Sequence, residues 1–300
     1  MIYTVTFNPS LDYVVALDKL QVGSINRTKD EDLFPGGKGI NVSLILQALG
    51  VPSRILGFKA GFTGDALERM LAARGCASEL LPVKDGFTRI NVKVRGRVET
   101  AINGKGPAIT EKDLDRLLKK LEQLKAEDIL VLSGSGPAGC SPALYREIAM
   151  LMGKKCVPCV VDAEGTLLQN ALEAGPFLVK PNREELEGLL GRALATEQDL
   201  LAGIRELQEA GARNVLVSLG SEGALLADRY GKIHKAKAPE GKVVNTVGSG
   251  DSMVAGFLAG YVRTKDYAEA LRWGVCAGSA TAFSLGLATK EDIERLMKKG

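Results

Sequence analysis

The chain has 300 residues, 45% of them hydrophobic and 25% charged, and it carries a formal net charge of +3 at pH 7. This composition is typical of a globular protein large enough to bury most of its apolar surface. The lysines and arginines are spread along the chain, and no apolar run approaches the ~20 residues of a membrane span, so neither nucleic acid nor a membrane is expected as a partner.

The N-terminal third of the chain contains two kinds of expected strand. Residues 2–7 form a strand pattern that begins without a basic leader or a cleavage site, so we expect a cytoplasmic protein. Residues 12–34 and 87–103 alternate polar and apolar side chains, which is typical of antiparallel strands with one open face. We expect these to form a small projecting sheet. Its apolar face needs a cover, a ligand or a second copy of the chain, and this predicts a homodimer.

A first glycine cluster, residues 35–39, precedes a helix expected over residues 42–49. Glycines at a helix N-terminus let an anion approach the free backbone N–H groups, and Lys38 and Asn41 add a charge and an amide. The spacing is not that of a P-loop, and it does not match the dinucleotide-binding fingerprint after a strand. A dinucleotide-dependent oxidoreductase is therefore a poorly supported alternative.

Short apolar runs alternate with helical patterns further along the chain, which predicts parallel βαβ units covered by helices on both faces. The expected strands are residues 128–132, 157–161, 177–179 and 215–217, and the expected helices are residues 141–152, 166–174, 183–190 and 197–210. Ligands of such sheets bind at the carboxyl ends of the strands. Polar clusters at those ends are therefore the candidates for a functional site.

The cysteines and the single histidine do not indicate a metal or redox site. Five cysteines are too few and too scattered for a disulfide framework. Cys156 and Cys159 have C-x-x-C spacing on an apolar run, but a second pair is missing and only His234 could complete a zinc site. We expect His234 at the surface of a short strand.

Two polar clusters follow the later strands. Asn182 is a good helix N-cap with Glu185 three residues later, so the pair is either a capping arrangement or a site that holds Mg²⁺ mostly through water. Residues 218–223 form a glycine turn that could offer backbone amides to the phosphates of a nucleotide. Either cluster alone is a weak signal.

The sharpest local signal is residues 245–251, which open a helix rich in small residues. Gly248, Ser249 and Gly250 would leave the N–H groups of the first helical turn free to bind a phosphate in transfer. Asp251 stands beside them, where it could orient a hydroxyl and accept its proton. The alternative is a tight turn with Asp251 as a helix cap.

Together the four clusters resemble the ribokinase-like PfkB family of sugar kinases, over essentially the whole chain. The resemblance implies a single α/β domain over residues 1–300, an α/β/α sandwich with a mostly parallel central sheet. It also implies a small β-sheet lid with strands from about residues 12–34 and 87–103.

The resemblance assigns roles to individual residues. Asp251 matches the catalytic base, with Gly248, Ser249 and Gly250 as the anion hole. Binding of MgATP is implied for Lys180, Asn182, Glu185, Ser218, Gly220, Ser221, Gly223, Ser249 and Gly250, with Mg²⁺ held by Asn182 and Glu185, mostly through water. Binding of the sugar is implied for Asp12, Gly37, Asn41 and Asn103, and binding of a sugar-borne phosphate for Arg27, Lys38 and Arg89.

The expected substrates are ATP and a sugar phosphate. Residues 6–12 and 88–93 are most similar to members that phosphorylate fructose 1-phosphate and to relatives that phosphorylate tagatose 6-phosphate. Residues 99–103, which end in Asn103, favour the phosphorylation of fructose 1-phosphate to fructose 1,6-bisphosphate. Tagatose 6-phosphate and fructose 6-phosphate are the alternatives, and Ala101 stands where an acidic residue is frequent. A non-catalytic sugar-phosphate sensor is the rival from another class, and the intact Asp251 argues against it.

Overall fold

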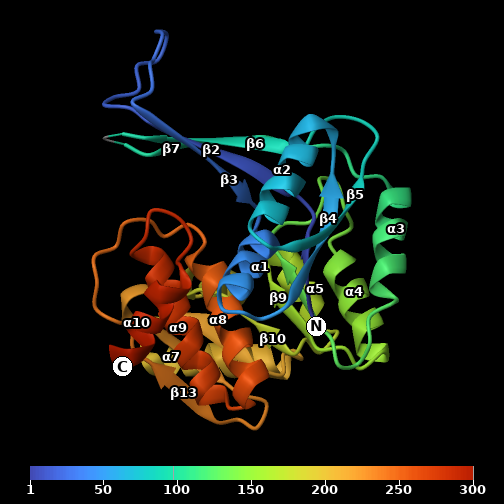
Figure 1. The fold of residues 1–300 in the computed structure, drawn as a ribbon. Coiled ribbons are helices and arrows are strands. Elements are labelled where there is room, and N and C mark those ends of the chain that lie inside the picture. Colours follow the sequence, from blue (N-terminus) through green and yellow to red (C-terminus); the bar gives the residue numbers. More distant parts are fainter. Residues whose placement is uncertain (97, 300) are drawn as a thin grey trace.

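The computed structural model describes residues 1–96 and 98–299, which form a large sheet flanked by helices and a smaller sheet at one side (Figure 1). Arg97, inside the second segment expected to form the small sheet, lies outside the described residues, as does Gly300. None of the helices in the described part of the chain is long and apolar enough to span a membrane.

The large sheet has the strand order β13-β12-β11-β10-β9-β8-β1-β4-β5. Neighbours from β11 to β5 run parallel, and β12 is antiparallel to both β11 and β13. The strands are β1 Ile2–Thr6, β4 Ser53–Lys59, β5 Ala77–Pro82, β8 Ile129–Ser133, β9 Cys159–Asp162, β10 Leu178–Val179, β11 Val215–Ser218, β12 Ala224–Ala227 and β13 Ile233–Ala236.

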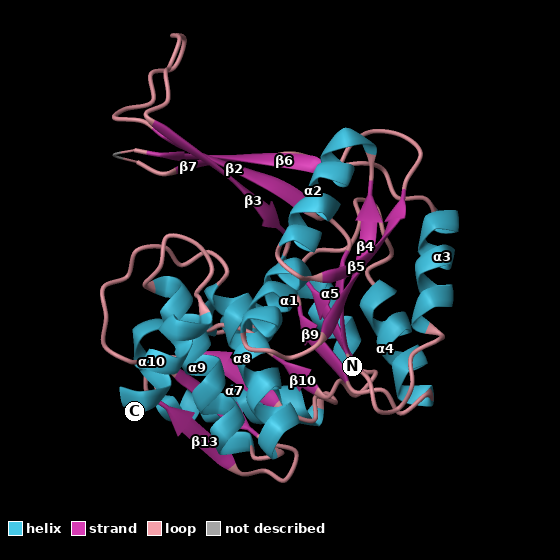
Figure 2. Ribbon diagram, viewed as in Figure 1, coloured by secondary structure: helices cyan, strands magenta, loops and turns pink. Residues whose placement is uncertain are grey.

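Helices cover both faces of this sheet (Figure 2). They are α1 Lys38–Ala48, α2 Gly61–Ala73, α3 Glu111–Leu121, α4 Leu144–Lys154, α5 Gly165–Leu172, α6 Arg183–Leu190, α7 Glu197–Glu209, α8 Ser249–Thr264, α9 Tyr267–Ala282 and α10 Lys290–Lys299, with a 3₁₀ turn at Gly220–Glu222. In one buried cluster, helices α3, α4, α5, α6 and α7 pack against one face of the sheet. In a second cluster, helices α1, α8, α9 and α10 pack against the other face.

Alternate strand residues serve these two clusters, as the period of two in a strand requires. Leu130 and Leu132 of β8 belong to the first cluster, and Ile129 and Val131 belong to the second. Strands buried on both faces read as continuous apolar runs. The predicted α/β fold with a mostly parallel central sheet is confirmed.

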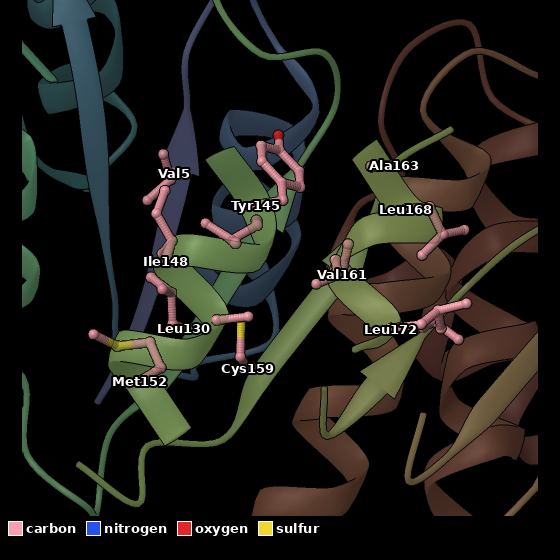
Figure 3. Close-up of a cluster of buried hydrophobic side chains, with 14 of the residues drawn as sticks. Val5, Leu130, Tyr145, Ile148, Met152, Cys159, Val161, Ala163, Leu168 and Leu172 are labelled. Atoms are coloured by element: carbon pink, nitrogen blue, oxygen red, sulfur yellow. The ribbon is translucent and has the colours of Figure 1, made fainter. Parts of the chain in front are cut away.

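Helix α4 illustrates how one helix covers the sheet (Figure 3). Tyr145, Ile148 and Met152 recur at the spacing of one helix face and lie in one cluster with Leu130 and Cys159 of the strands beneath. All three helix side chains are fully buried. The apolar stripe of α4 therefore forms the contact between this helix and the sheet.

The smaller sheet has the order β3-β2-β6-β7, with β2 Ser10–Ala16, β3 Asp30–Gly36, β6 Arg89–Arg95 and β7 Thr100–Asn103. In Figure 1 these strands project beyond the body on the side of α8 to α10. The hairpins β2–β3 and β6–β7 are antiparallel, as expected, but β2 and β6 pair in parallel. The expectation of a purely antiparallel sheet was wrong. The two hairpins meet through their first strands, β2 and β6, and these two strands run in the same direction.

Two smaller expectations also need correction. The side chain of His234 is only 8% exposed and its Nε2 lies 2.8 Å from Oδ2 of Asp228, so it is not a surface residue. Cys159 starts β9, but Cys156 lies outside the strand, exposed and with a φ of 56°. All five cysteines are free.

Candidate active site

A cleft of about 1070 Å³ opens at the carboxyl ends of the parallel strands, between the body and the smaller sheet. It collects residues from all four polar clusters of the sequence. The predicted site residues that line it are Asp12, Gly37, Lys38, Asn41, Arg89, Asn103, Lys180, Asn182, Glu185, Ser218, Gly220, Ser221, Gly248, Ser249, Gly250 and Asp251.

Asp251 lies in the first turn of α8, with only 5% of its surface exposed. Its Oδ2 accepts a hydrogen bond of 2.8 Å from Nδ2 of Asn41. The pKa of Asp251 is raised to about 6, mainly by burial and then by the charge of Asp162, against the opposing effects of Asn41, Lys38 and Lys180. The alternative of a helix cap does not hold, because the N-cap residue is Gly248.

The N-terminus of α8 is built to receive an anion. Gly248 adopts a φ of 82°, and no side chain caps the helix, so N–H groups of its first turn stay available to a phosphate. A side chain at position 250 would meet Nζ of Lys180 at 3.1 Å. A positive charge therefore lies against the same helix end.

Lys180 is held in that place by a buried ion pair. Its Nζ lies 3.2 Å from Oδ1 of Asp162, and the two side chains are 6% and 3% exposed. Asp162 is the last residue of β9 and also lines the cleft. Asp162 was not expected from the sequence, because its only signal there is a carboxylate that ends an apolar run.

Asn182 and Glu185 form a complete capping box at the start of α6. Oδ1 of Asn182 accepts a hydrogen bond of 2.7 Å from N–H of Glu185, and Oε2 of Glu185 accepts one of 2.8 Å from N–H of Asn182. Burial raises the pKa of Glu185, while the hydrogen bond from Asn182 opposes this. Because the cap uses Oε2, the other carboxylate oxygen remains for a ligand. The cap and a metal site are thus compatible.

Asp12 on β2 forms the centre of a polar network on the small sheet. Its Oδ1 accepts hydrogen bonds from Ser10 at 2.7 Å and from Asn91 at 2.9 Å. Its Oδ2 accepts one from Nζ of Lys93 at 2.8 Å. Ser10, Asn91 and Lys93 all line the cleft and were missed. The grouping of Asn91 and Lys93 with Asp12 depends on the register of β2 with β6.

Two further cations face the cleft. Burial lowers the pKa of Lys38, but the charges of Asp162, Asp251 and Glu164 outweigh it and raise the pKa overall. Burial also lowers the pKa of the Arg89 guanidinium, with Asp12 opposing, and Nε of Arg89 is buried without a hydrogen-bond partner among the described residues. Arg89 is thus available to an anionic ligand, and Nζ of Lys38 lies 3.4 Å from Oε1 of the exposed Glu164.

The lining of the cleft also includes a glycine turn and several apolar side chains. The 3₁₀ turn carries Gly220 and Ser221 into the lining, and a parallel bridge joins Ser218 to Asn182. Val243, Ala282 and Phe283 also line the cleft, and N–H of Val244 donates to the carbonyl of Ala282 at 2.8 Å. The sequence offered no motif for these apolar residues.

Two predicted residues lie outside the lining. Arg27 is exposed on the connection between β2 and β3, which extends from the outer end of the small sheet (Figure 1). Gly223 adopts a φ of 96°, and a side chain there would meet the carbonyl oxygen of Ala236 at 2.0 Å. Gly223 thus shapes the turn that carries Gly220. The roles given to both residues stay predictions.

Comparison with known sequences gives one family and close relatives. Residues 5–294 match the pfkB family carbohydrate kinases. The chain is 43% identical over 297 residues to a 1-phosphofructokinase of Bacillus subtilis, covering 99% of this chain and 97% of that protein. It is 38% identical over 297 residues to a D-tagatose-1-phosphate kinase of Bacillus licheniformis, covering 99% and 96% respectively.

Solved structures agree with this result. Phosphofructokinase-2 from Escherichia coli, in complex with substrates and products, matches with a TM-score of 0.94 and 31% identity, over 99% of this chain and 98% of that one. The ribokinase of Arabidopsis thaliana, complexed with ribose and ATP, matches with a TM-score of 0.81 at 22% identity, with 99% and 98% covered. The expected ribokinase-like fold is confirmed.

Proposed function

Because the chain belongs to the pfkB family of carbohydrate kinases and is an ATP-dependent sugar-phosphate kinase, we propose that its substrate is fructose 1-phosphate. The γ-phosphoryl group of ATP would pass to the 6-hydroxyl, giving fructose 1,6-bisphosphate and ADP. The observation that carries the proposal is the buried carboxylate of Asp251 beside the uncapped N-terminus of α8.

Asp251 acts as the proton acceptor in this proposal. A carboxyl group with a pKa of about 6 is mostly ionised at neutral pH, and it is more basic than an ordinary aspartate. It orients the hydroxyl and takes its proton as the oxygen–phosphorus bond forms. The bond between the γ-phosphorus and the bridging oxygen of ATP breaks, and ADP leaves with that oxygen.

The phosphoryl group in transfer is held by charges and dipoles. Its transition state is loose, so alignment and neutralisation of its oxygens matter more than strong basicity. The first-turn N–H groups of α8 and the ammonium group of Lys180 face this position. Asp162 keeps Lys180 there through the ion pair of 3.2 Å.

The residues around Glu185 fit a hydrated Mg²⁺ ion. Glu185 keeps one carboxylate oxygen outside its cap, Asn182 and Asp162 line the same cleft, and the charge of Asp162 acts on Glu185. Mg²⁺ prefers oxygen ligands, retains several waters and takes few carboxylates. When bound, the ion would neutralise charge on the phosphates of ATP. We propose that Asn182 and Glu185 hold it mostly through water.

Preference for a sugar phosphate over a free sugar is supported by the cations. Arg89 lines the cleft near Asp12, where the sugar hydroxyls are proposed to bind, and Lys38 lines the same cleft near Asp162 and Asp251. The two relatives described above are named for ketose 1-phosphates, which favours a phosphate at carbon 1. Tagatose 1-phosphate is therefore the second candidate. It replaces tagatose 6-phosphate as the closer alternative.

The small sheet is proposed to act as a lid and as the surface of a homodimer. A closed lid would exclude water, which otherwise competes with the sugar as acceptor. The sheet and its connections expose Val22, Ile25, Val98 and Ile102, with Val22 95% exposed. A second copy would cover these side chains.

Both substrates are cytoplasmic metabolites, so we place the enzyme in the cytoplasm.

The test is ADP release with MgATP and a panel of fructose 1-phosphate, tagatose 1-phosphate, tagatose 6-phosphate, fructose 6-phosphate and ribose. We expect the highest kcat/KM with fructose 1-phosphate. Preference for another sugar phosphate would overturn the substrate and retain the chemistry. A folded protein that binds sugar phosphates without ADP release would support the sensor alternative instead.

A further inference from the structure

The inner face of the small sheet carries an unassigned lysine. Arg89, Asn91 and Lys93 alternate along β6, so they point to the same side of the sheet, and all three line the cleft. Asp12 lies beside them on β2, in register with Asn91. The face thus presents a carboxylate surrounded by two cations and an amide.

Lys93 is bound to this carboxylate. Its Nζ donates to Oδ2 of Asp12 at 2.8 Å, and the side chains of Lys93 and Asp12 are 20% and 15% exposed. Ser10 and Asn91 occupy the other oxygen. Within the described residues, Asp12 is the one acceptor of the Lys93 ammonium, although that group can donate three hydrogen bonds. The ion pair therefore lies directly at the edge of the cleft.

The neighbouring strand leaves this ion pair undisturbed. Ala101 of β7 stands opposite Lys93 in the antiparallel register. Directly opposed residues share one face of a sheet, and opposite charges there attract each other. A carboxylate at position 101 would compete with Asp12 for the ammonium group. Alanine cannot compete, so Lys93 stays with Asp12.

A carboxylate that binds sugar hydroxyls is unfavourable near a substrate that carries its own phosphate. An ionised carboxylate is a strong acceptor for sugar hydroxyls, but a negative charge in a partly buried cleft repels a phosphate dianion. Three hydrogen bonds keep Asp12 oriented, and one of them comes from a cation that cancels its charge. The carboxylate can then accept hydroxyls without repelling the phosphate.

We propose that Lys93 is a specificity-determining residue that neutralises Asp12 and so lets the cleft accept a phosphorylated sugar. The inference rests on the proposed function, because it concerns the same sugar site. Lys93 acts through Asp12 and is a positioning residue. Arg89 and Lys38 contact the phosphate in the proposal above, whereas Lys93 removes an unfavourable charge.

The first experiment compares a phosphorylated with an unphosphorylated ligand by calorimetry. For Lys93→Met we expect the Kd of fructose 1-phosphate to rise by roughly tenfold or more, and the Kd of fructose to change by less than about threefold. Lys93→Arg keeps the charge and should restore binding. Equal weakening of both ligands would show a merely structural support of Asp12 and overturn the proposal, as would unchanged binding of both.

A double-mutant cycle tests whether Lys93 acts through Asp12. In the background of Asp12→Asn, which has no charge to neutralise, Lys93→Met should change the Kd of fructose 1-phosphate by less than about threefold. A loss as large as in the wild-type background would mean that Lys93 contacts the phosphate directly, and it would overturn the proposal.

Lys120→Met is the matched control. Lys120 pairs with Glu79 at 2.7 Å and does not line the cleft, so its replacement should leave both affinities unchanged. Thermal unfolding of each variant verifies that it is folded. These experiments measure binding, so they test the role of Lys93 separately from the proposed reaction. If the wild type did not turn over fructose 1-phosphate, the proposed reaction would be overturned, but the role of Lys93 would not.

Discussion

The side-chain amide of Asn41 donates a hydrogen bond of 2.8 Å to Oδ2 of Asp251, across 210 residues of sequence. Asn41 follows the first glycine cluster, on α1, and Asp251 follows the second, on α8. The bond joins the N-terminal ends of two helices that approach the cleft from one layer of the fold. It fixes the carboxylate and stabilises its ionised form.

This bond makes the pH dependence of the reaction predictable. The pKa of Asp251 is raised to about 6, so kcat/KM should fall as the pH drops through that value and the base becomes protonated. Asn41 lowers this pKa, so Asn41→Ala should move the acid limb to higher pH. Asp162 raises it, so Asp162→Asn should move the limb to lower pH. The wild type and the two variants use the same substrates, so titration of the substrates cannot cause a difference among their pH profiles. Acid limbs that coincide for the three proteins would contradict the prediction.

Removal of the base tests the chemistry itself. Asp251→Asn keeps the shape of the side chain but cannot accept a proton, so kcat should fall by about 10²- to 10⁴-fold. The Kd of the sugar phosphate should stay nearly the same, because the Asp12 network is untouched. Single-turnover kinetics and calorimetry measure the two quantities. A variant within about tenfold of the wild-type kcat would exclude Asp251 as the base.

The capping box allows the metal role of Glu185 to be separated from its structural role. Glu185→Gln retains a side-chain oxygen for N–H of Asn182 but removes the charge. The free energy of unfolding should change by less than about 1 kcal/mol. The Mg²⁺ concentration for half-maximal rate should rise by roughly tenfold or more.

Glu185→Ala is the comparison, because it removes both the cap and the charge. It should lower the midpoint of urea unfolding as well as the apparent affinity for Mg²⁺. If Glu185→Gln left the Mg²⁺ dependence unchanged while Glu185→Ala lost stability, Glu185 would be a cap only.

The parts of this fold that follow from local pattern could be predicted from the sequence. Apolar runs such as that of β8 are continuous because both faces are buried, and polar clusters that follow parallel strands meet at one edge. This is why Asn182 and Ser218 were expected near one another, whereas the family resemblance placed Asp251 with them; all three line one cleft. Their chemical roles remain predictions.

The parts that depend on strand pairing could not be predicted. Alternation in β2 and β6 indicates strands, but it does not name their partners, so the parallel pairing was missed. The contacts of Asp12 with Asn91 and Lys93 were missed for the same reason, because only the parallel register of β2 and β6 creates them. Asp162 belongs to no motif, and its importance follows from its position beside Lys180. Lone charges gain meaning only from tertiary contacts.

Cys156 offers a test of backbone strain that is independent of function. It follows α4 in the left-handed region, with a φ of 56°, and its N–H donates to the carbonyl of Gly153 at 3.0 Å. The next N–H, that of Val157, donates to the carbonyl of Met152 at 3.0 Å, which is the pattern of a helix end that favours glycine.

Cys156→Gly should therefore stabilise the protein. A left-handed conformation costs a residue with a Cβ about 1–2 kcal/mol, and glycine avoids this but loses about 0.5–1 kcal/mol of chain entropy on folding. Because Cys156 is exposed, few contacts are lost, and we expect a gain of about 0.5–1 kcal/mol in urea unfolding under reducing conditions. Cys156→Ala retains the Cβ and should give no gain. Equal stabilisation by both variants would assign the effect to the thiol instead of the backbone.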